Sequence, residues 1–171
     1  GQQHGFHPYK DDSGSKIDYQ IIDTANLDFD SLHPSIKVDR AYISEVQPVV
    51  LVLDGPFGEQ AYGIITELCK AVENIQSISV MGKAAGFQGE IGDIIVLRDA
   101  FIIEGETHTY DLTNDIKVND FADTPANTHY GNMLTVIGTP YSSPEIIEFF
   151  MKCYGKFVGL EMEGGSFMRG I

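Results

Sequence analysis

The sequence is poor in cysteine and in long apolar runs, and each shortage excludes a class of protein. Its two cysteines, Cys69 and Cys153, lie in apolar helical patterns, which predicts buried reduced thiols rather than a disulfide-rich scaffold. No apolar run approaches the roughly 18 to 20 residues that cross a bilayer, and no basic-then-apolar signal begins the chain. We therefore expect a soluble, cytoplasmic protein with no membrane partner.

Basic residues are also scarce. Only 11 Lys and Arg stand against 25 Asp and Glu, so the formal net charge is -14. A field of this sign repels phosphate backbones, and we expect no nucleic-acid partner. It does not exclude a small phosphorylated ligand, because backbone amides and a single Lys can make one pocket locally positive. The alternative interpretation is that the acidity serves solubility alone.

The composition, 43% hydrophobic and 21% charged over 171 residues, is typical of one compact domain. Residues 1–16 are rich in Gly, Gln, Asp and Ser and show no apolar periodicity, which predicts a flexible N-terminal tail before a domain over 17–171. His4 and His7 lie in this tail without further ligands, so no metal site is predicted.

A strand, a turn and a helix follow one another in the first half of the predicted domain. The uninterrupted run Val49–Leu53 predicts a central strand buried on both faces. Glycines at 55 and 58 make a turn, and apolar residues at helical spacing over 61–72 predict a helix. A second strand at 78–81 would complete a βαβ crossover with parallel pairing.

The rest of the chain continues the alternation of strands and helices. A glycine-rich turn leads into strands at 94–97 and 101–103, followed by a polar excursion with at most a short strand at 108–112. Further elements are a strand at 133–137, a helix from Ser143 through Tyr154, a strand at 157–160 and a final helix from Ser166. This order predicts an α/β fold, with a mixed, partly parallel central sheet flanked by helices.

Two motifs follow predicted strands. The first is SVMGKAAGFQGEIGDIIV at residues 79–96, and the second is GLEMEG at residues 159–164. A glycine-rich turn at the carboxyl end of a strand lets backbone N–H groups approach an anion closely. We therefore select Gly82, Lys83 and Ala84 as candidate phosphate-binding residues.

The two motifs, in this order, resemble the purine nucleoside phosphorylase and uridine phosphorylase superfamily, which includes the nucleosidases of methylthioadenosine and AMP. The resemblance covers about residues 47–171. It implies a small-molecule nucleoside or nucleotide as ligand, association into homo-oligomers, and neither cofactor nor metal. Inorganic phosphate would be the co-substrate if the reaction is phosphorolysis.

The resemblance also implies roles for individual residues. Glu163 would accept hydrogen bonds from the two ribose hydroxyls, Met162 would pack against the sugar, and Glu161 would orient the strand end or a neighbour. Tyr141 would stack on the base. The alternatives are that Glu163 is only an acid favoured by the dipole at a helix N-terminus, and that Tyr141 only packs its loop.

Two positions depart from the family pattern. Where this chain has Lys83, the family usually carries a small hydroxyl residue, and where it has Val80, phosphorylases often carry an arginine. These differences weaken the case for phosphorolysis, so hydrolysis of the nucleoside and binding without reaction both stay open. The family's general acid, an aspartate on a later strand, has no counterpart here, so no catalytic residue is assigned and the domain is expected to lack its C-terminal part.

Two function classes follow. One is an enzyme that cleaves the N-glycosidic bond of a nucleoside or nucleotide whose ribose is held by Glu163, as a nucleosidase or a phosphorylase. The other is a catalytically incomplete phosphorylase-like domain used for ligand binding, sensing or assembly. A dinucleotide-binding module is disfavoured, because the glycines at 82–92 lead into a strand, whereas the dinucleotide fingerprint opens a helix.

Overall fold

The computed structural model describes residues 4–105, 109–111, 113–137 and 143–171. The chain divides into two compact units, Gly1–Pro56 and Phe57–Ile171. This boundary does not coincide with the one expected after residue 16. It lies in the glycine turn between the strand at Val49–Leu53 and the helix that follows.

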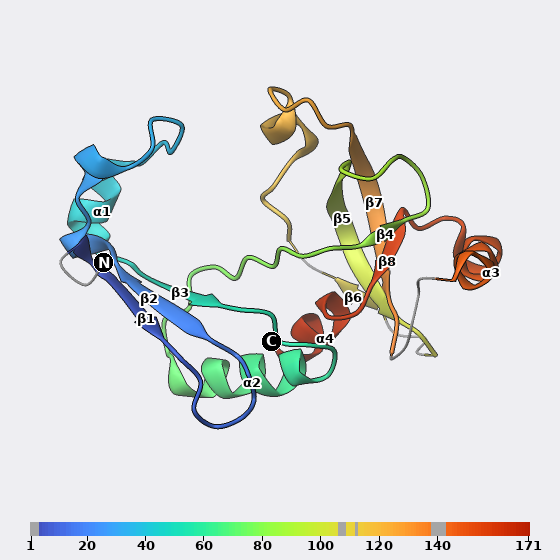
Figure 1. Ribbon diagram of the computed structural model, residues 1–171, viewed down its shortest axis with the longest axis horizontal. Coiled ribbons are helices and arrows are strands. Elements are labelled where there is room, and N and C mark those ends of the chain that lie inside the picture. The colour runs from blue at the N-terminus through green and yellow to red at the C-terminus, as the bar shows by residue number, and fades with distance from the viewer. Residues whose placement is uncertain (1–3, 106–108, 112, 138–142) are drawn as a thin grey trace. The chain divides into compact units, whose positions relative to one another are not determined.

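The first unit is built on a three-stranded antiparallel sheet in the order β1-β2-β3 (Figure 1). Its strands are β1 (Phe6–Tyr9), β2 (Tyr19–Asp23) and β3 (Val49–Leu53), and α1 (Arg40–Val46) precedes β3. β1 pairs with β2 along its whole length, so residues 6–9, which fall in the expected tail, form a strand. The cross-strand pair Tyr9 and Tyr19 stacks with ring centroids 4.8 Å apart.

The predicted strand at Val49–Leu53 exists, but its predicted surroundings are wrong. It stands last in its sheet and pairs antiparallel with β2, and residues 78–81 form no strand, so there is no parallel βαβ crossover between the two segments. A β-branched run predicts an extended conformation, but it does not distinguish a central strand from one at the end of a sheet.

The second unit contains a five-stranded mixed sheet in the order β4-β8-β7-β5-β6. Its strands are β4 (Ala85–Gly86), β5 (Ile94–Ile103), β6 (Thr109–Asp111), β7 (Thr128–Thr135) and β8 (Gly159–Glu161). β5, β7 and β8 run parallel, whereas β4 and β6 pair antiparallel with β8 and β5. The predicted mixed, partly parallel sheet is confirmed.

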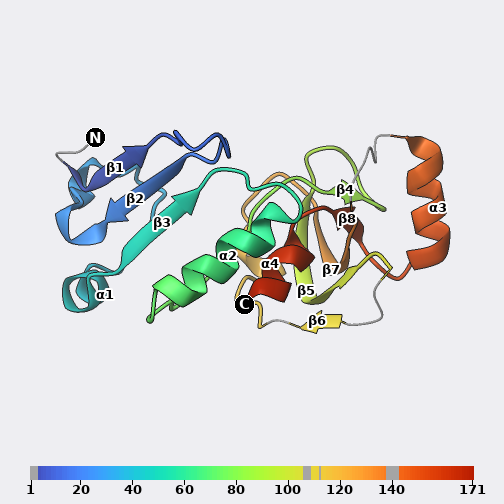
Figure 2. The ribbon, with the colours of Figure 1, turned by 90° about the horizontal axis from the view of Figure 1, so that it is seen from below.

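Helices pack on both faces of this sheet (Figure 2). Leu134 of β7 lies in a buried apolar cluster with Phe150 of α3 (Pro144–Tyr154). The next residue of β7, Thr135, points the other way and contacts Gly165 of α4 (Gly164–Gly170), because successive side chains of a strand alternate between faces. The predicted helix at 144–154, with Ser143 at its N-cap, is confirmed.

α4 also packs closely against α2 (Gln60–Ala71). A Cβ atom on Gly170 would lie 2.3 Å from Cγ2 of Ile65 and 3.0 Å from the carbonyl oxygen of Tyr62, so the two backbones meet where only glycine fits. The guanidinium of Arg169 lies over the Tyr62 ring, 4.7 Å from its centroid. This packing joins the end of α4 to the first half of α2.

Candidate functional site

The carboxyl ends of three parallel strands meet at one edge of the five-stranded sheet. Ile103 of β5 pairs with Thr135 of β7, and Thr135 pairs in turn with Glu161 of β8. In α/β sheets, ligands bind in the crevice outside the carboxyl ends of the strands. The Glu161-Met162-Glu163 motif therefore lies where such a site is expected.

The Glu161 side chain turns back into the fold. Its Oε1 accepts a hydrogen bond from the Thr135 hydroxyl, and its Oε2 accepts the backbone N–H groups of Glu163, at 2.7 Å, and of Gly164. Burial raises the pKa of Glu161, and the charge of Glu163 adds to this, while the three hydrogen bonds act in the opposite direction. Glu161 thus anchors the chain at the start of α4.

Glycine allows α4 to approach the sheet at this point. A Cβ atom on Gly165 would lie 2.6 Å from Cγ1 of Ile103 and 2.6 Å from Oγ1 of Thr135, both closer than real Cβ contacts. The Gly165 N–H donates to the Thr135 hydroxyl at 2.7 Å. Thr135 is only 1% exposed, so its hydroxyl is shared entirely among protein groups.

Glu163 is half-buried at the N-cap of α4. Its Oε1 accepts the backbone N–H of Gly58 at 3.2 Å. Within the described part of the chain, this is the one hydrogen bond of the Glu163 carboxylate. A carboxylate offers about four acceptor positions, so most of the hydrogen-bonding capacity of Glu163 is available to a ligand.

The other predicted ligand-binding residues lie in different surroundings. Met162 is half-buried and packs against the apolar cluster that includes Leu160 and Phe157. Gly82, Lys83 and Ala84 form an exposed segment that leads into β4. Because β4 pairs antiparallel with β8, this segment enters the sheet from the edge where Glu161 lies.

Tyr141 lies outside the described residues, so its predicted role stays a prediction. Thr135 and Gly58 are two residues of the site that the motif does not contain. A single hydroxyl inside the apolar run at 133–137 was the signal for Thr135, because a buried polar side chain needs a partner. Gly58 lies 105 residues before Glu163, and no local pattern links them.

A second polar cluster lies at the opposite edge of the same sheet. Nε2 of His129 lies 2.8 Å from Oδ2 of Asp93, which also accepts the Glu90 N–H at 2.9 Å, and Asn127 donates to Oδ1 at 3.2 Å. The hydrogen bond with His129 is the main cause that lowers the pKa of Asp93 to about 2. These residues precede β5 and begin β7, at the amino ends of the strands, so they are remote from Glu163.

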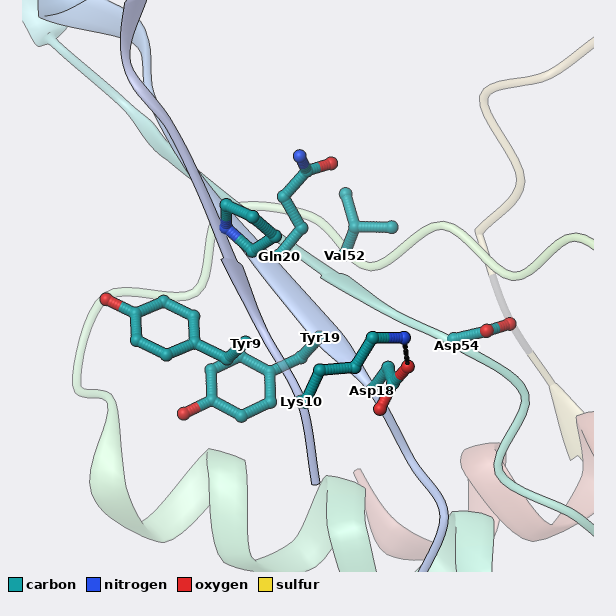
Figure 3. A pocket seen from close by; sticks show the side chains of 8 residues that line it. Tyr9, Lys10, Asp18, Tyr19, Gln20, Val52 and Asp54 are labelled. Atoms are coloured by element: carbon teal, nitrogen blue, oxygen red, sulfur yellow. Dashed lines mark hydrogen bonds and ion pairs between the residues drawn. The ribbon is translucent and has the colours of Figure 1, made fainter. Parts of the chain in front are cut away.

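The first unit carries a shallow pocket of about 280 Å³ at the ends of its strands (Figure 3). Tyr9, Tyr19 and the ion pair of Lys10 with Asp18 line it. None of the residues selected from the sequence takes part in it. In the described ranges, no helix has the length and apolar character needed to cross a bilayer, and no three potential metal-ligating side chains gather together.

The fold is that of the 5′-methylthioadenosine/S-adenosylhomocysteine nucleosidases, which belong to the nucleoside phosphorylase-like superfamily. The S-adenosylhomocysteine nucleosidase of Streptococcus pyogenes, in complex with 5-methylthiotubericidin, aligns at a TM-score of 0.64 and 13% identity, over 98% of this chain and 69% of its own. The nucleosidase of Helicobacter pylori gives 0.62 and 13%, over 96% and 68%. That of Colwellia psychrerythraea, in complex with adenine, gives 0.58 and 12%, over 96% and 66%.

At these identities the likeness shows the fold alone. Over residues 1–171 the sequence matches the model of a family of unknown function (DUF6909), and the chain belongs to this family. No curated protein matches the sequence.

Proposed function

We propose that the chain binds a nucleoside or nucleotide at the carboxyl edge of β7 and β8 and cleaves its N-glycosidic bond, with the ribose held by Glu163. The observation that carries this proposal is the position of the Glu163 carboxylate. It projects from the start of α4, where parallel strands end, and has a single protein hydrogen bond in the described chain. The likeness of the fold to nucleosidases supports the same function.

The chemistry suits a carboxylate at this place. As the N-glycosidic bond lengthens, positive charge builds on the ribosyl ring, and a carboxylate that holds the two hydroxyls stabilises that charge more strongly than it does the ground state. A carboxylate offers about four acceptor positions, and the hydrogen bond from Gly58 uses one of them. Glu163 can therefore accept both ribose hydroxyls while it keeps its hydrogen bond to Gly58.

The departing base needs a proton or a hydrogen bond as the bond breaks. Asp93 is unsuited to supply it, because it lies at the amino ends of the strands, is held by His129, and has a pKa lowered to about 2. We assign the acid to no residue. The attacking group is water or phosphate, and Lys83, at the same edge as Glu163, is the candidate contact for phosphate.

The second candidate function is ligand binding without turnover, for sensing or assembly. Binding needs only the Glu163 carboxylate, whereas cleavage also needs a group that protonates or hydrogen-bonds the departing base. The two functions share the same binding site and differ in whether free base is released, so one set of experiments separates them.

The first test measures binding of adenosine, inosine, uridine and AMP by calorimetry, with and without phosphate. Glu163→Ala should weaken binding by about 1.5 to 3 kcal/mol, the loss expected for a hydrogen bond to a charged group. Glu148→Ala is the matched control, because Glu148 is a glutamate of α3 with a 65% exposed side chain that forms an ion pair with Lys152. Chromatography of the same mixtures detects released base.

The outcomes are distinct. Binding that depends on Glu163 together with release of base supports the enzyme. Binding that depends on Glu163 without release supports the ligand-binding domain. If no compound binds, or if Glu163→Ala and Glu148→Ala behave alike, the proposed site is wrong.

A further inference from the structure

The start of α4 is fixed to the sheet by a chain of hydrogen bonds with a defined direction. The Gly165 N–H donates to the Thr135 oxygen, the Thr135 hydroxyl donates to Oε1 of Glu161, and Oε2 of Glu161 accepts from Glu163 and Gly164. Thr135 has a single hydroxyl proton, so Glu161 must present an acceptor to it. Each member of the chain therefore depends on the next.

This series of hydrogen bonds restricts the movement of the turn at residues 161–165. Thr135 is 1% exposed and belongs to β7, which is paired on both sides by β5 and β8. Gly165 lies against Thr135 and Ile103 so closely that a methyl group would not fit. The turn cannot shift relative to β7 without breaking these hydrogen bonds.

Glu163 is held at two points as a result. Its backbone N–H is bound by Glu161, and its carboxylate is bound by Gly58. A carboxylate that accepts two vicinal hydroxyls must present both acceptors in the correct orientation, and a displacement of about 1 Å is enough to lose much of the interaction.

We propose that Thr135, acting through Glu161, is a positioning residue for Glu163, and that this link sets the preference of the site for ribonucleosides over nucleosides without ribose hydroxyls. The inference rests on the proposed function for its ligand, but the link itself exists in the free protein. Glu161, in this assignment, contacts the start of α4 and not the ligand.

The test compares Thr135→Val, which keeps the shape and removes the hydroxyl, with Thr135→Ser, which keeps the hydroxyl. Calorimetry measures the affinity of each for adenosine and for 2′,3′-dideoxyadenosine. Thr135→Val should weaken adenosine binding about tenfold, the scale expected for one lost hydrogen bond, and should leave dideoxyadenosine binding unchanged. Thr135→Ser should behave as the wild type.

A second readout needs no ligand. Hydrogen exchange followed by NMR should show the Gly58 amide exchanging about tenfold faster in Thr135→Val and at the wild-type rate in Thr135→Ser, because Gly58 is protected by the Glu163 carboxylate. If Thr135→Val does not fold, Glu161→Gln provides the same two readouts, since it keeps the shape and replaces one acceptor by a donor.

The results separate the two proposals. If the wild type binds no nucleoside, the proposed function fails, and the exchange rate of Gly58 still decides whether Thr135 positions Glu163. If that rate does not change in Thr135→Val, the positioning role is overturned. If Thr135→Val weakens adenosine and dideoxyadenosine equally, Thr135 supports only the fold and the inference is likewise overturned.

Discussion

The contact between Gly165 and the sheet predicts a large cost for a single methyl group. In Gly165→Ala the new Cβ would lie 2.6 Å from Ile103 Cγ1 and 2.9 Å from Thr135 Cβ, and both neighbours are 1% exposed and belong to paired strands. Overpacking of this kind costs about 1 to 3 kcal/mol. Loss of the hydrogen bond to Thr135 adds about 1 kcal/mol, and the better helix propensity of alanine returns at most about 1 kcal/mol.

The net destabilisation is therefore about 1 to 3 kcal/mol, which lowers the Tm by about 2 to 12 °C for a chain of this size. Differential scanning calorimetry measures it. Gly63→Ala is the control, because Gly63 lies inside α2 and no described atom outside that helix lies within 4 Å of its added Cβ. Gly63→Ala should raise the Tm by about 2 to 4 °C. If Gly165→Ala is as stable as the wild type, α4 does not approach β7 as closely as described.

Three further predictions concern titration and backbone geometry. Because burial raises the pKa of Glu161, wild-type stability should fall as pH rises above about 4.5, and Glu161→Gln should lack that part of the slope of Tm against pH. Asp93 behaves in the opposite way: with its pKa lowered to about 2, its stabilising contribution is present above its ordinary pKa of 3.8 and lost as pH falls towards about 2, so Asp93→Asn should flatten the acid limb of the same plot. If the slope of Tm against pH is the same in Glu161→Gln as in the wild type, the prediction for Glu161 is wrong. The same result for Asp93→Asn would contradict the prediction for Asp93. Finally, Gly89 and Gly92 have φ angles of +90° and +102°, but only Gly89 has a neighbour in the way, with His129 Nε2 at 2.3 Å, so Gly89→Ala should lower the Tm more than Gly92→Ala, and equal losses would show that strain alone is measured.

Much of the second unit was predictable from local pattern. The apolar runs at 94–97 and 101–103 predicted the two ends of β5, and the run at 133–137 predicted the last three residues of β7. Helical spacing with Ser143 before a proline predicted α3. These signals are strong because burial, propensity and capping agree in each segment. The strand β1 was missed, because FHPY is short and mixes polar with apolar residues.

The site was only partly predictable. The Glu161-Met162-Glu163 motif located it at the end of a strand, but two chemically identical carboxylates in one motif do not reveal which faces inward. That distinction depends on strand register, which places Thr135 beside Glu161, and on a turn far away in the sequence that brings Gly58 to Glu163. Both are properties of the tertiary structure, which local periodicity does not encode.

The alternation of residues along β7 has a consequence for how this protein can change during evolution. Leu134 and Val136 belong to the apolar cluster beneath α3, whereas Thr135, between them, serves the polar chain beneath α4. The side chains on the two faces contact different partners, so a substitution on one face removes none of the contacts made by the other. A lineage can therefore alter ligand preference through Thr135 while the stability supplied by its two neighbours is preserved, and can absorb drift in the cluster without altering the ligand.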